Sequence, residues 1–456
     1  MASVAKREHG SIDMTQGSPM RLILTFSLPL LLGNAFQQLY NMVDSMVVGK
    51  FVSDAALAAV GTAFPLIFLL SSLFIGLGMG GTVMIAQFIG AEDRNSVRET
   101  VNTIYSALLV IIVPLTIFGV LIAEPLLRLI QVNEEVFPMA HTYAVVVFAG
   151  VIGSFGYNVN TGIMQGLGDS KTPLLFLAIA CVINIVLDLL FVLVFGLGVF
   201  GVALATIIAQ FCSWIFGIFY INKKYSFIHI SFFRYRLDKG LLSRLVRLGI
   251  PSGIQQCQLA VAVLMIQSLV NSFGTDFMAG FSAANKIDTF AFMPIQSFGT
   301  AAVTYVGQNL GAGKLDRVQH GVRRVMVLSI ITCAIISAIV VPAGPLLLRM
   351  FTNKSAVIEA GMAYLYAVLG PMFILAATFT VNSALQGAGA TVVSMLSSIV
   401  SLWAIRIPVA YLLAPLGRNM IYWSYPIGWL LGLLISGTVY LRGRWKNRYQ
   451  NLQVSE

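Results

Sequence analysis

Long apolar runs separated by short polar connections are the feature that most constrains this chain. A helix needs about 20 apolar residues to cross roughly 30 Å of hydrocarbon, and within lipid only helices and closed barrels satisfy their own backbone polar groups. Of the 456 residues, 58% are hydrophobic and 10% are charged. We therefore predict an all-α, polytopic membrane protein of twelve transmembrane helices. The expected spans are 20–46, 56–84, 98–122, 138–161, 172–194, 199–221, 246–271, 277–306, 320–341, 360–382, 392–414 and 420–441.

The lysines and arginines indicate the topology. With the amino terminus inside, 21 of the 28 basic residues fall at inner connections, five fall at outer ones, and Lys286 and Arg406 lie within spans. Basic residues concentrate on the cytoplasmic side of membrane proteins. We therefore expect a multi-pass protein of the plasma (inner) membrane with both termini in the cytoplasm. Because topology accounts for the net charge of +10, no nucleic-acid partner is expected.

The chain contains an internal repeat. A shift of 221 residues aligns 87–91 (Gln-Phe-Ile-Gly-Ala) with 308–312 (Gln-Asn-Leu-Gly-Ala), and the Gln-Gly-x-Gly segment 165–168 with 386–389. Each half holds an even number of helices, so the halves share one topology and form a parallel pseudo-twofold repeat. The expected parts are an N-terminal lobe at 1–221, a cytoplasmic linker at 222–247 and a C-terminal lobe at 248–456.

Asn184 and Asp188 are polar residues within an apolar run, and their four-residue spacing places them on one helix face. A charged side chain at the bilayer centre costs a few kcal/mol even on mild scales, so such residues usually face a bundle interior or a wet cavity. These two residues therefore mark a candidate functional site. The alternative is a hydrogen-bonded polar pair that only fixes helix contacts.

Residues 38–49 (Gln-Leu-Tyr-Asn-Met-Val-Asp-Ser-Met-Val-Val-Gly), the paired Gln-Gly-x-Gly segments and the six-plus-six repeat together resemble the multidrug and toxic compound extrusion (MATE) family, in particular its DinF-like branch. The resemblance covers residues 20 to 441. It implies two six-helix lobes forming a V-shaped cavity. It also implies an antiporter that exports amphipathic, often cationic, small molecules by alternating access, driven by inward H⁺ or Na⁺.

The resemblance assigns site residues by position. The cation-coupling residues are Asp44, Asn184, Asp188 and Thr206. Asn158 matches a polar cavity residue, and Thr161 stands where the family has asparagine. The NorM-type branch has acidic residues in helices seven and ten, whereas Gln255 and its neighbours stand here in helix seven, so coupling is expected in the first lobe. The expected substrate-cavity residues are Asn158, Thr161, Gln255, Asp288 and Arg406.

The residue types at the coupling site suit a cation switch. Two adjacent carboxylates in a low-dielectric site cannot both stay ionised without a proton or cation. The side-chain oxygens of Asn184 and Thr206 are ligands that a hard cation prefers. We expect cation arrival to neutralise Asp44 and Asp188, to let the first helix repack and to weaken substrate binding. No cofactor is expected, and no metal beyond Na⁺ at this site.

Arg406 and Asp288 have no repeat counterparts. An unpaired cation in the bilayer is costly, so we expect Arg406 to meet helix carbonyls, polar neighbours or Asp288, in a structural or a substrate-facing role. Gly76, Gly78, Gly80 and Gly81 predict either close helix packing or a flexible segment.

Three other functional classes fit the sequence less well. A flippase for lipid-linked oligosaccharide or another amphipathic lipid would need several cationic cavity residues for a diphosphate, and only Lys286 and Arg406 are available. A membrane enzyme would need a catalytic constellation, but no HExxH motif occurs, so no catalytic residues are assigned. A two-lobe repeat favours alternating access over a channel. The expected partners are small amphipathic substrates and the lipid bilayer, and the chain is expected to be a monomer.

Overall fold

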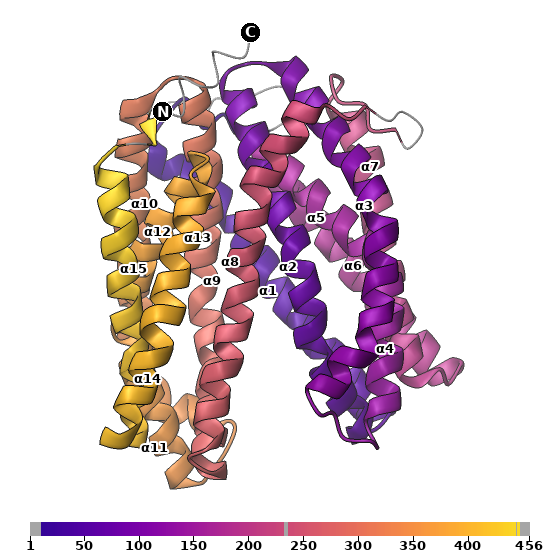
Figure 1. Ribbon diagram of the computed structural model, residues 1–456, viewed down its shortest axis with the longest axis vertical. Coiled ribbons are helices and arrows are strands. Elements are labelled where there is room, and N and C mark those ends of the chain that lie inside the picture. Colours follow the sequence, from indigo (N-terminus) through magenta and orange to yellow (C-terminus); the bar gives the residue numbers. More distant parts are fainter. Residues whose placement is uncertain (1–10, 232–235, 444, 447–456) are drawn as a thin grey trace. The chain divides into compact units, whose positions relative to one another are not determined.

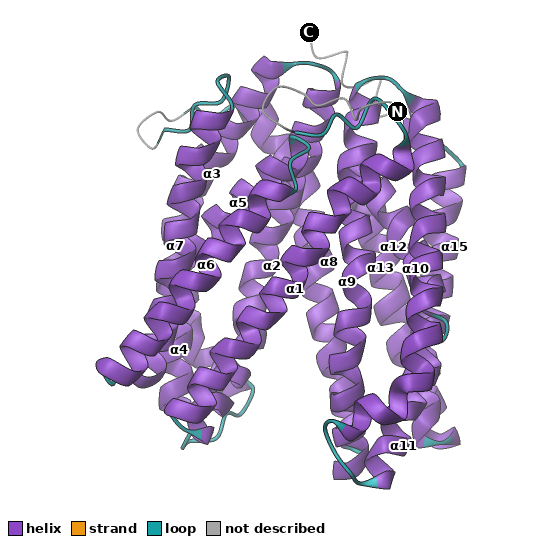
Figure 2. Ribbon diagram, turned by 180° about the vertical axis from the view of Figure 1, so that it is seen from behind, coloured by secondary structure: helices purple, strands orange, loops and turns teal. Residues whose placement is uncertain are grey.

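The computed structural model describes residues 11–231, 236–443 and 445–446, and within these residues it contains helices and no strand (Figures 1 and 2). The α-helices are α1 (Pro19–Phe51), α2 (Asp54–Gly90), α3 (Arg94–Leu129), α4 (Phe137–Ala149), α5 (Val151–Gly166), α6 (Lys171–Leu189), α7 (Gly198–Lys224), α8 (Lys239–Asn271), α9 (Thr275–Gly311), α10 (Leu315–Arg349), α11 (Ser355–Tyr364), α12 (Met372–Gly387), α13 (Thr391–Ile399), α14 (Ile407–Leu413) and α15 (Ser424–Leu441). The π-helices are η2 (Leu190–Val194), η3 (Leu365–Leu369) and η4 (Val400–Arg406), and the 3₁₀ helices are η5 (Ala414–Leu416) and η6 (Arg418–Trp423).

The helices account for the predicted spans. In the described part of the chain, nine helical stretches are long and apolar enough to cross a membrane, and two bent pairs, α4–α5 and α11–α12, pass the same test together. The remaining long helix, α9, has 37 residues and carries Asp276, Lys286 and Asp288, which makes it more polar. With α9 the described helices supply twelve spans, and the prediction of an all-α, polytopic membrane protein is confirmed.

Two of the spans are bent, which the sequence did not predict. The α4–α5 pair bends by 51° and the α11–α12 pair by 45°. The first break lies at Gly150 and the second at Gly370 and Pro371, so the breaks occupy positions related by the repeat offset. Gly168 and Gly389, also one offset apart, both adopt positive φ angles, 87° and 78°. The repeat is therefore visible in backbone conformation as well as in sequence.

The described residues form two compact units. The C-unit contains Met14–Leu31 and the chain from Gln258 onward, and the N-unit contains Leu32–Cys257 together with residues 11–13. The unit boundaries thus fall inside α1 and inside α8. They differ at these places from the boundaries expected for the lobes, because the start of each lobe's first helix packs with the other half of the sequence.

Hydrogen bonds explain why residues 14–31 belong to the C-unit. The backbone N–H of Met14 donates to Gln308 Oε1 at 3.1 Å, and Asn309 Nδ2 donates to the carbonyl of Met14 at 2.9 Å. Arg317 Nη2 donates to the carbonyl of Gly17 at 3.1 Å. The segment that leads into α1 is therefore bonded to the end of α9 and the start of α10.

Glycines explain why the first half of α8 belongs to the N-unit. A Cβ atom on Gly76 of α2 would lie 2.2 Å from the backbone nitrogen of Gly253, and one on Gly80 would lie 2.9 Å from that of Gly249. Because glycine has no side chain, the backbones of α2 and α8 lie closer together here than a Cβ atom would allow. The close-packing interpretation of the α2 glycines is confirmed for Gly76 and Gly80.

Each unit has its own packed interior. In the N-unit α2 packs against α5, α3 and α4, and α6 packs against α7. In the C-unit α9 packs against α10, α11 and α12, and α12 also packs against α15. The C-unit core is strongly aromatic: the Tyr422 ring contacts those of Phe277, Phe281 and Tyr364, and the Phe281 ring also contacts that of Tyr364.

Candidate functional site

The four predicted cation-coupling residues come together in the N-unit. Asp44 of α1 is 9% exposed, and Asn184 and Asp188 of α6 are fully buried. The carboxyl groups of Asp44 and Asp188 lie close enough to interact as a pair. Asn184 Nδ2 donates to Thr206 Oγ1 of α7 at 3.4 Å. Three helices therefore place two carboxyl groups, an amide and a hydroxyl in one buried cluster.

The pattern of α6 explains why its acid points inward. Its buried residues recur at helical spacing from Phe176 through Ala180 and Asn184 to Asp188, so the polar pair continues the same inward face. The α-helical part ends at Leu189, and the π-helix η2 follows directly from Leu190. Single π-helical turns are often found at functional sites, and this one begins two residues after Asp188.

Two tyrosines complete the cluster. Tyr40 lies one turn before Asp44 on α1, and its hydroxyl lies near Thr206, Asp44 and Asp188. Tyr143 of α4 is buried and lies close to Asp44, Tyr40 and Asp188. The sequence interpretation missed both residues. The four-residue spacing from Asp44 could have indicated Tyr40, whereas nothing in the sequence connects Tyr143 with α1 or α6.

Several oxygens of the cluster have no hydrogen-bond donor. Asp44 Oδ1, Asn184 Oδ1 and both carboxyl oxygens of Asp188 are buried without a hydrogen-bond partner. A buried acceptor without a partner costs about 1–3 kcal/mol, and more when it is charged. Convergent, unpartnered oxygens suit a proton or a hard cation such as Na⁺. The residues present therefore fit the coupling ion that the sequence implies.

A pocket adjoins the carboxyl pair. It encloses about 320 Å³ of empty space, including space open to solvent. Its lining residues lie nearer the start of α1 and α6 and the end of α7 than the acidic cluster does, and Tyr40 belongs to both. The lining residues are Gln37, Tyr40, Tyr157, Leu177, Ala180, Cys181, Ala209 and Gln210.

The predicted substrate-cavity residues do not line this pocket. Asn158 and Thr161 share α5 with the pocket residue Tyr157; Asn158 Nδ2 donates to the carbonyl of Ser154 at 2.8 Å, and Thr161 Oγ1 is buried without a hydrogen-bond partner. Gln255 lies on the part of α8 that belongs to the N-unit. A role in binding stays a prediction for these three residues.

Asp288 and Arg406 lie in the C-unit. Arg406 is 4% exposed, and its guanidinium carbon lies 3.4 Å from the ring centroid of Tyr425. Asp288 Oδ2 accepts a hydrogen bond from the Tyr364 hydroxyl at 3.1 Å. Arg406 and Asp288 are therefore connected through tyrosines, with no direct ion pair between these two described residues. The expectation that Arg406 meets polar neighbours is confirmed for Tyr425.

The four cysteines are free thiols. Within residues 11–231, 236–443 and 445–446, no three His, Cys, Asp or Glu side chains are grouped so that they could hold a metal ion.

Apolar spanning helices, a buried acidic cluster and an adjoining pocket define the class of protein as a polytopic membrane transporter. The MatE family model matches residues 29–190 and 251–412, two segments that follow the internal repeat. The chain is 31% identical over 436 residues, 95% of this chain and 97% of the relative, to "Probable multidrug resistance protein YpnP" of Bacillus subtilis. It is 27% identical over 452 residues, 93% of each chain, to "Probable multidrug resistance protein NorM" of Thermotoga maritima.

The fold has solved counterparts. A structure described as the "Outward-facing conformation of a multidrug resistance MATE family transporter of the MOP superfamily" superposes with a TM-score of 0.89 at 23% identity, covering 98% of this chain and 100% of the other. The chain belongs to the MatE family. The predicted family is confirmed, as is the prediction that the chain is a transporter and not an enzyme, while placement in the DinF-like branch stays a prediction.

Proposed function

We propose that this protein is a cation-coupled multidrug efflux antiporter, which exports amphipathic, often cationic, small molecules by alternating access while H⁺ or Na⁺ moves inward. The observation that carries the proposal is the adjacent buried carboxyl pair, Asp44 and Asp188, with three of its oxygens unpartnered. Two such groups in a low-dielectric site need a proton or a cation. The names of the relatives above support the substrate class.

The pocket gives the exchange a physical basis. Its residue Tyr40 lies beside both carboxyl groups, so the positive group of a substrate in the pocket would lie near the same negative charge. A coupling cation on the pair removes that charge and weakens the attraction. Cation and substrate then compete for one charge, and this competition converts inward cation movement into outward substrate movement.

Asn184 and Thr206 have supporting roles in this scheme. Thr206 Oγ1 donates to the carbonyl of Val202 at 3.0 Å and accepts a hydrogen bond from Asn184 Nδ2 at 3.4 Å, and the Tyr40 hydroxyl lies nearby. The amide oxygen of Asn184 has no hydrogen-bond partner and is available to a bound Na⁺. The residues that hold the coupling ion are thus Asp44, Asp188 and Asn184, with Thr206 and Tyr40 orienting them.

The proposed setting is the plasma membrane, with a monomeric chain and both termini in the cytoplasm, as the distribution of basic residues indicates. A flippase is not favoured, because Arg406 is buried against Tyr425 and is not available to a diphosphate.

Reconstitution tests the proposal. Purified protein in liposomes is loaded with a fluorescent amphipathic cation, and pH and Na⁺ gradients are imposed separately. One gradient is expected to drive movement of the compound against its own gradient, and protein-free liposomes serve as the control. If several amphipathic cations fail to move under either gradient, the proposal is wrong.

A further inference from the structure

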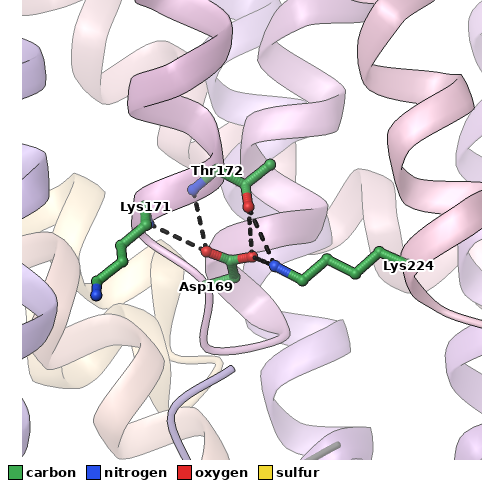
Figure 3. Close-up of polar contacts among 4 residues, drawn as sticks. All are labelled: Asp169, Lys171, Thr172 and Lys224. Atoms are coloured by element: carbon green, nitrogen blue, oxygen red, sulfur yellow. Dashed lines mark hydrogen bonds and ion pairs between the residues drawn. The ribbon is translucent and has the colours of Figure 1, made fainter. Parts of the chain in front are cut away.

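Asp169 and Lys224 form a buried ion pair where α6 begins and α7 ends (Figure 3). Lys224 Nζ lies 2.5 Å from Asp169 Oδ2, and the two side chains are 17% and 3% exposed. Lys224 Nζ also donates to Thr172 Oγ1 at 3.2 Å, and Thr172 Oγ1 donates to Asp169 Oδ2 at 2.6 Å. Removing charges from water is costly unless further hydrogen bonds are made; here Lys224 donates to two side chains, and the Asp169 carboxylate accepts from Thr172 and from two backbone N–H groups as well.

Each member of the pair also belongs to a helix terminus. Asp169 Oδ1 accepts hydrogen bonds from the backbone N–H groups of Lys171 and Thr172, both at 3.1 Å, which otherwise lack partners at the start of a helix. Lys224 is the last residue of α7, where a positive charge is favourable. The pair therefore joins the beginning of α6 to the end of α7.

Aromatic residues enclose the lysine. Lys224 Nζ lies 5.4 Å from the ring centroid of Tyr220 and 5.7 Å from that of Tyr225. Burial and the nearby Asp169 carboxylate raise the pKa of Tyr225, so its phenol stays neutral beside the pair. The charge on Lys224 is thus held by one carboxylate and two ring faces.

The ion pair occurs in one half of the repeat. The 221-residue offset places Ala390 and Trp445 at the positions of Asp169 and Lys224; Trp445 Nε1 donates instead to the carbonyl of Tyr440 at 2.9 Å. The same offset places Ile405 and Val409 at the positions of Asn184 and Asp188. The half that carries the acidic cluster is therefore also the half that carries the ion pair.

Two further hydrogen bonds join α6 to α7 between the ion pair and the acidic cluster, and they fix the axial register of the two helices. Ser213 Oγ donates to the carbonyl of Phe176 at 3.0 Å, and Asn184 Nδ2 donates to Thr206 Oγ1 at 3.4 Å. Phe176 and Asn184 are eight positions apart along α6, and Ser213 and Thr206 are seven positions apart along α7. The two hydrogen bonds are therefore separated by nearly the same length on both helices. A slip of one residue would move the helices by about 1.5 Å relative to each other. That slip would break the Asn184–Thr206 hydrogen bond.

We propose that Asp169 and Lys224 are positioning residues for cation coupling: their ion pair fixes the register of α6 against α7, and so holds Asn184 and Asp188 in place against Thr206. This inference rests on the proposed function. The pair contacts neither substrate nor coupling ion and acts through the two helices that it joins.

The test measures cation binding by the full-length purified protein. H⁺ and Na⁺ are titrated separately, and the cation concentration at half-maximal stabilisation against thermal unfolding is recorded, since a ligand that binds the folded state raises its stability. Lys224→Met is expected to shift this midpoint by about tenfold, the size of a typical coupling between sites. Lys223→Met, the exposed neighbour at the same helix end, is the matched control and is expected to leave the midpoint unchanged.

Two further variants guard against a folding defect. Lys224→Arg keeps the charge with a different donor geometry and is expected to shift the midpoint less, in the same direction. The double variant Asp169→Asn with Lys224→Met is expected to shift the midpoint no more than the larger of the shifts caused by Asp169→Asn alone and Lys224→Met alone. The effects of two residues that act as a pair are not additive.

The two ways of failing are distinct. If the proposed function is wrong, neither cation will change the thermal stability of the wild-type protein. That result would overturn this inference too. Failure of the inference alone would appear as a normal wild-type response together with equal midpoints for Lys224→Met and Lys223→Met, even if Lys224→Met unfolds at a lower temperature.

Discussion

Glu92 and Gly313 adopt the same left-handed backbone conformation, with φ angles of 61° and 70°, at positions one repeat offset apart. The hydrogen bonds around them also correspond: Asp93 N–H donates to the carbonyl of Phe88 at 3.0 Å, and Lys314 N–H donates to that of Asn309 at 2.9 Å. Both residues close the helix before them, α2 or α9. Glycine adopts this conformation without steric cost, whereas glutamate does not.

This correspondence predicts different responses to substitution. Gly313→Ala is expected to destabilise the protein by about 1 kcal/mol, the lower end of the cost of a left-handed L-residue. Glu92→Gly is expected to be neutral or slightly stabilising, because relief of strain is offset by the flexibility of glycine in the unfolded chain. Thermal unfolding in one detergent measures both, with Glu92→Ala as the control that keeps the strain. Equal losses for Gly313→Ala and Glu92→Gly would contradict the strain argument.

The carboxyl pair predicts a loss of coupling without a loss of folding. Asp44→Asn and Asp188→Asn each remove a charge from the pair while keeping the side-chain size, so gradient-driven efflux should fall to the level of protein-free liposomes. The thermal stability of either variant should be unchanged or higher, because two adjacent buried carboxylates repel each other.

Asp54→Asn is the matched control for the carboxyl pair, since Asp54 is exposed in the first turn of α2. It should leave efflux unchanged. Coupled efflux retained by both Asp44→Asn and Asp188→Asn would show that these residues only fix helix contacts.

The glycine contact between α2 and α8 predicts a position-dependent cost along one helix. Gly76→Ala places a Cβ atom 2.2 Å from the backbone of Gly253, so the helices must separate, at a cost of about 1–3 kcal/mol. Gly61→Ala on the same helix meets nothing within 4 Å and should gain up to about 1 kcal/mol from helix propensity. The yield of monodisperse protein and its melting temperature measure the difference, and similar values for the two variants would exclude the close contact.

Arg406 is expected to act through its contact with Tyr425. Arg406→Lys loses the planar group that stacks 3.4 Å from the ring centroid, and the loss of a desolvated cation–π contact should cost about 2 kcal/mol. Tyr425→Phe keeps the ring face and should cost less than Tyr425→Leu. Melting temperatures and efflux are measured together. Arg406→Lys with a normal melting temperature and a strong transport defect would point instead to a substrate-facing role.

Much of the fold follows from local sequence properties. A helix must cross a hydrocarbon layer of set thickness, so each apolar run that is long enough is counted as one span. The 221-residue offset predicts equivalent backbone conformations, which Gly168 and Gly389 show. Asn184 and Asp188 stand out as polar residues in an apolar helix, so the acidic part of the candidate site is also visible in the sequence. Its role in coupling stays a prediction.

Tertiary structure decided what depends on contacts between residues far apart in the chain. Tyr143 joins the acidic cluster because α4 packs against α2 and α7. Helix carbonyls, polar neighbours and Asp288 were all expected partners of Arg406, and its guanidinium lies over the ring of Tyr425. The units divide within α1 and α8 because hydrogen bonds at Met14 and glycine contacts at Gly253 fix the ends of these helices. The sequence by itself determined which segments span the membrane and which residues are costly there, since both follow from local composition. Only packing decided which of those residues meet, because apolar helix faces fit many partners and the matching of their side chains selects one.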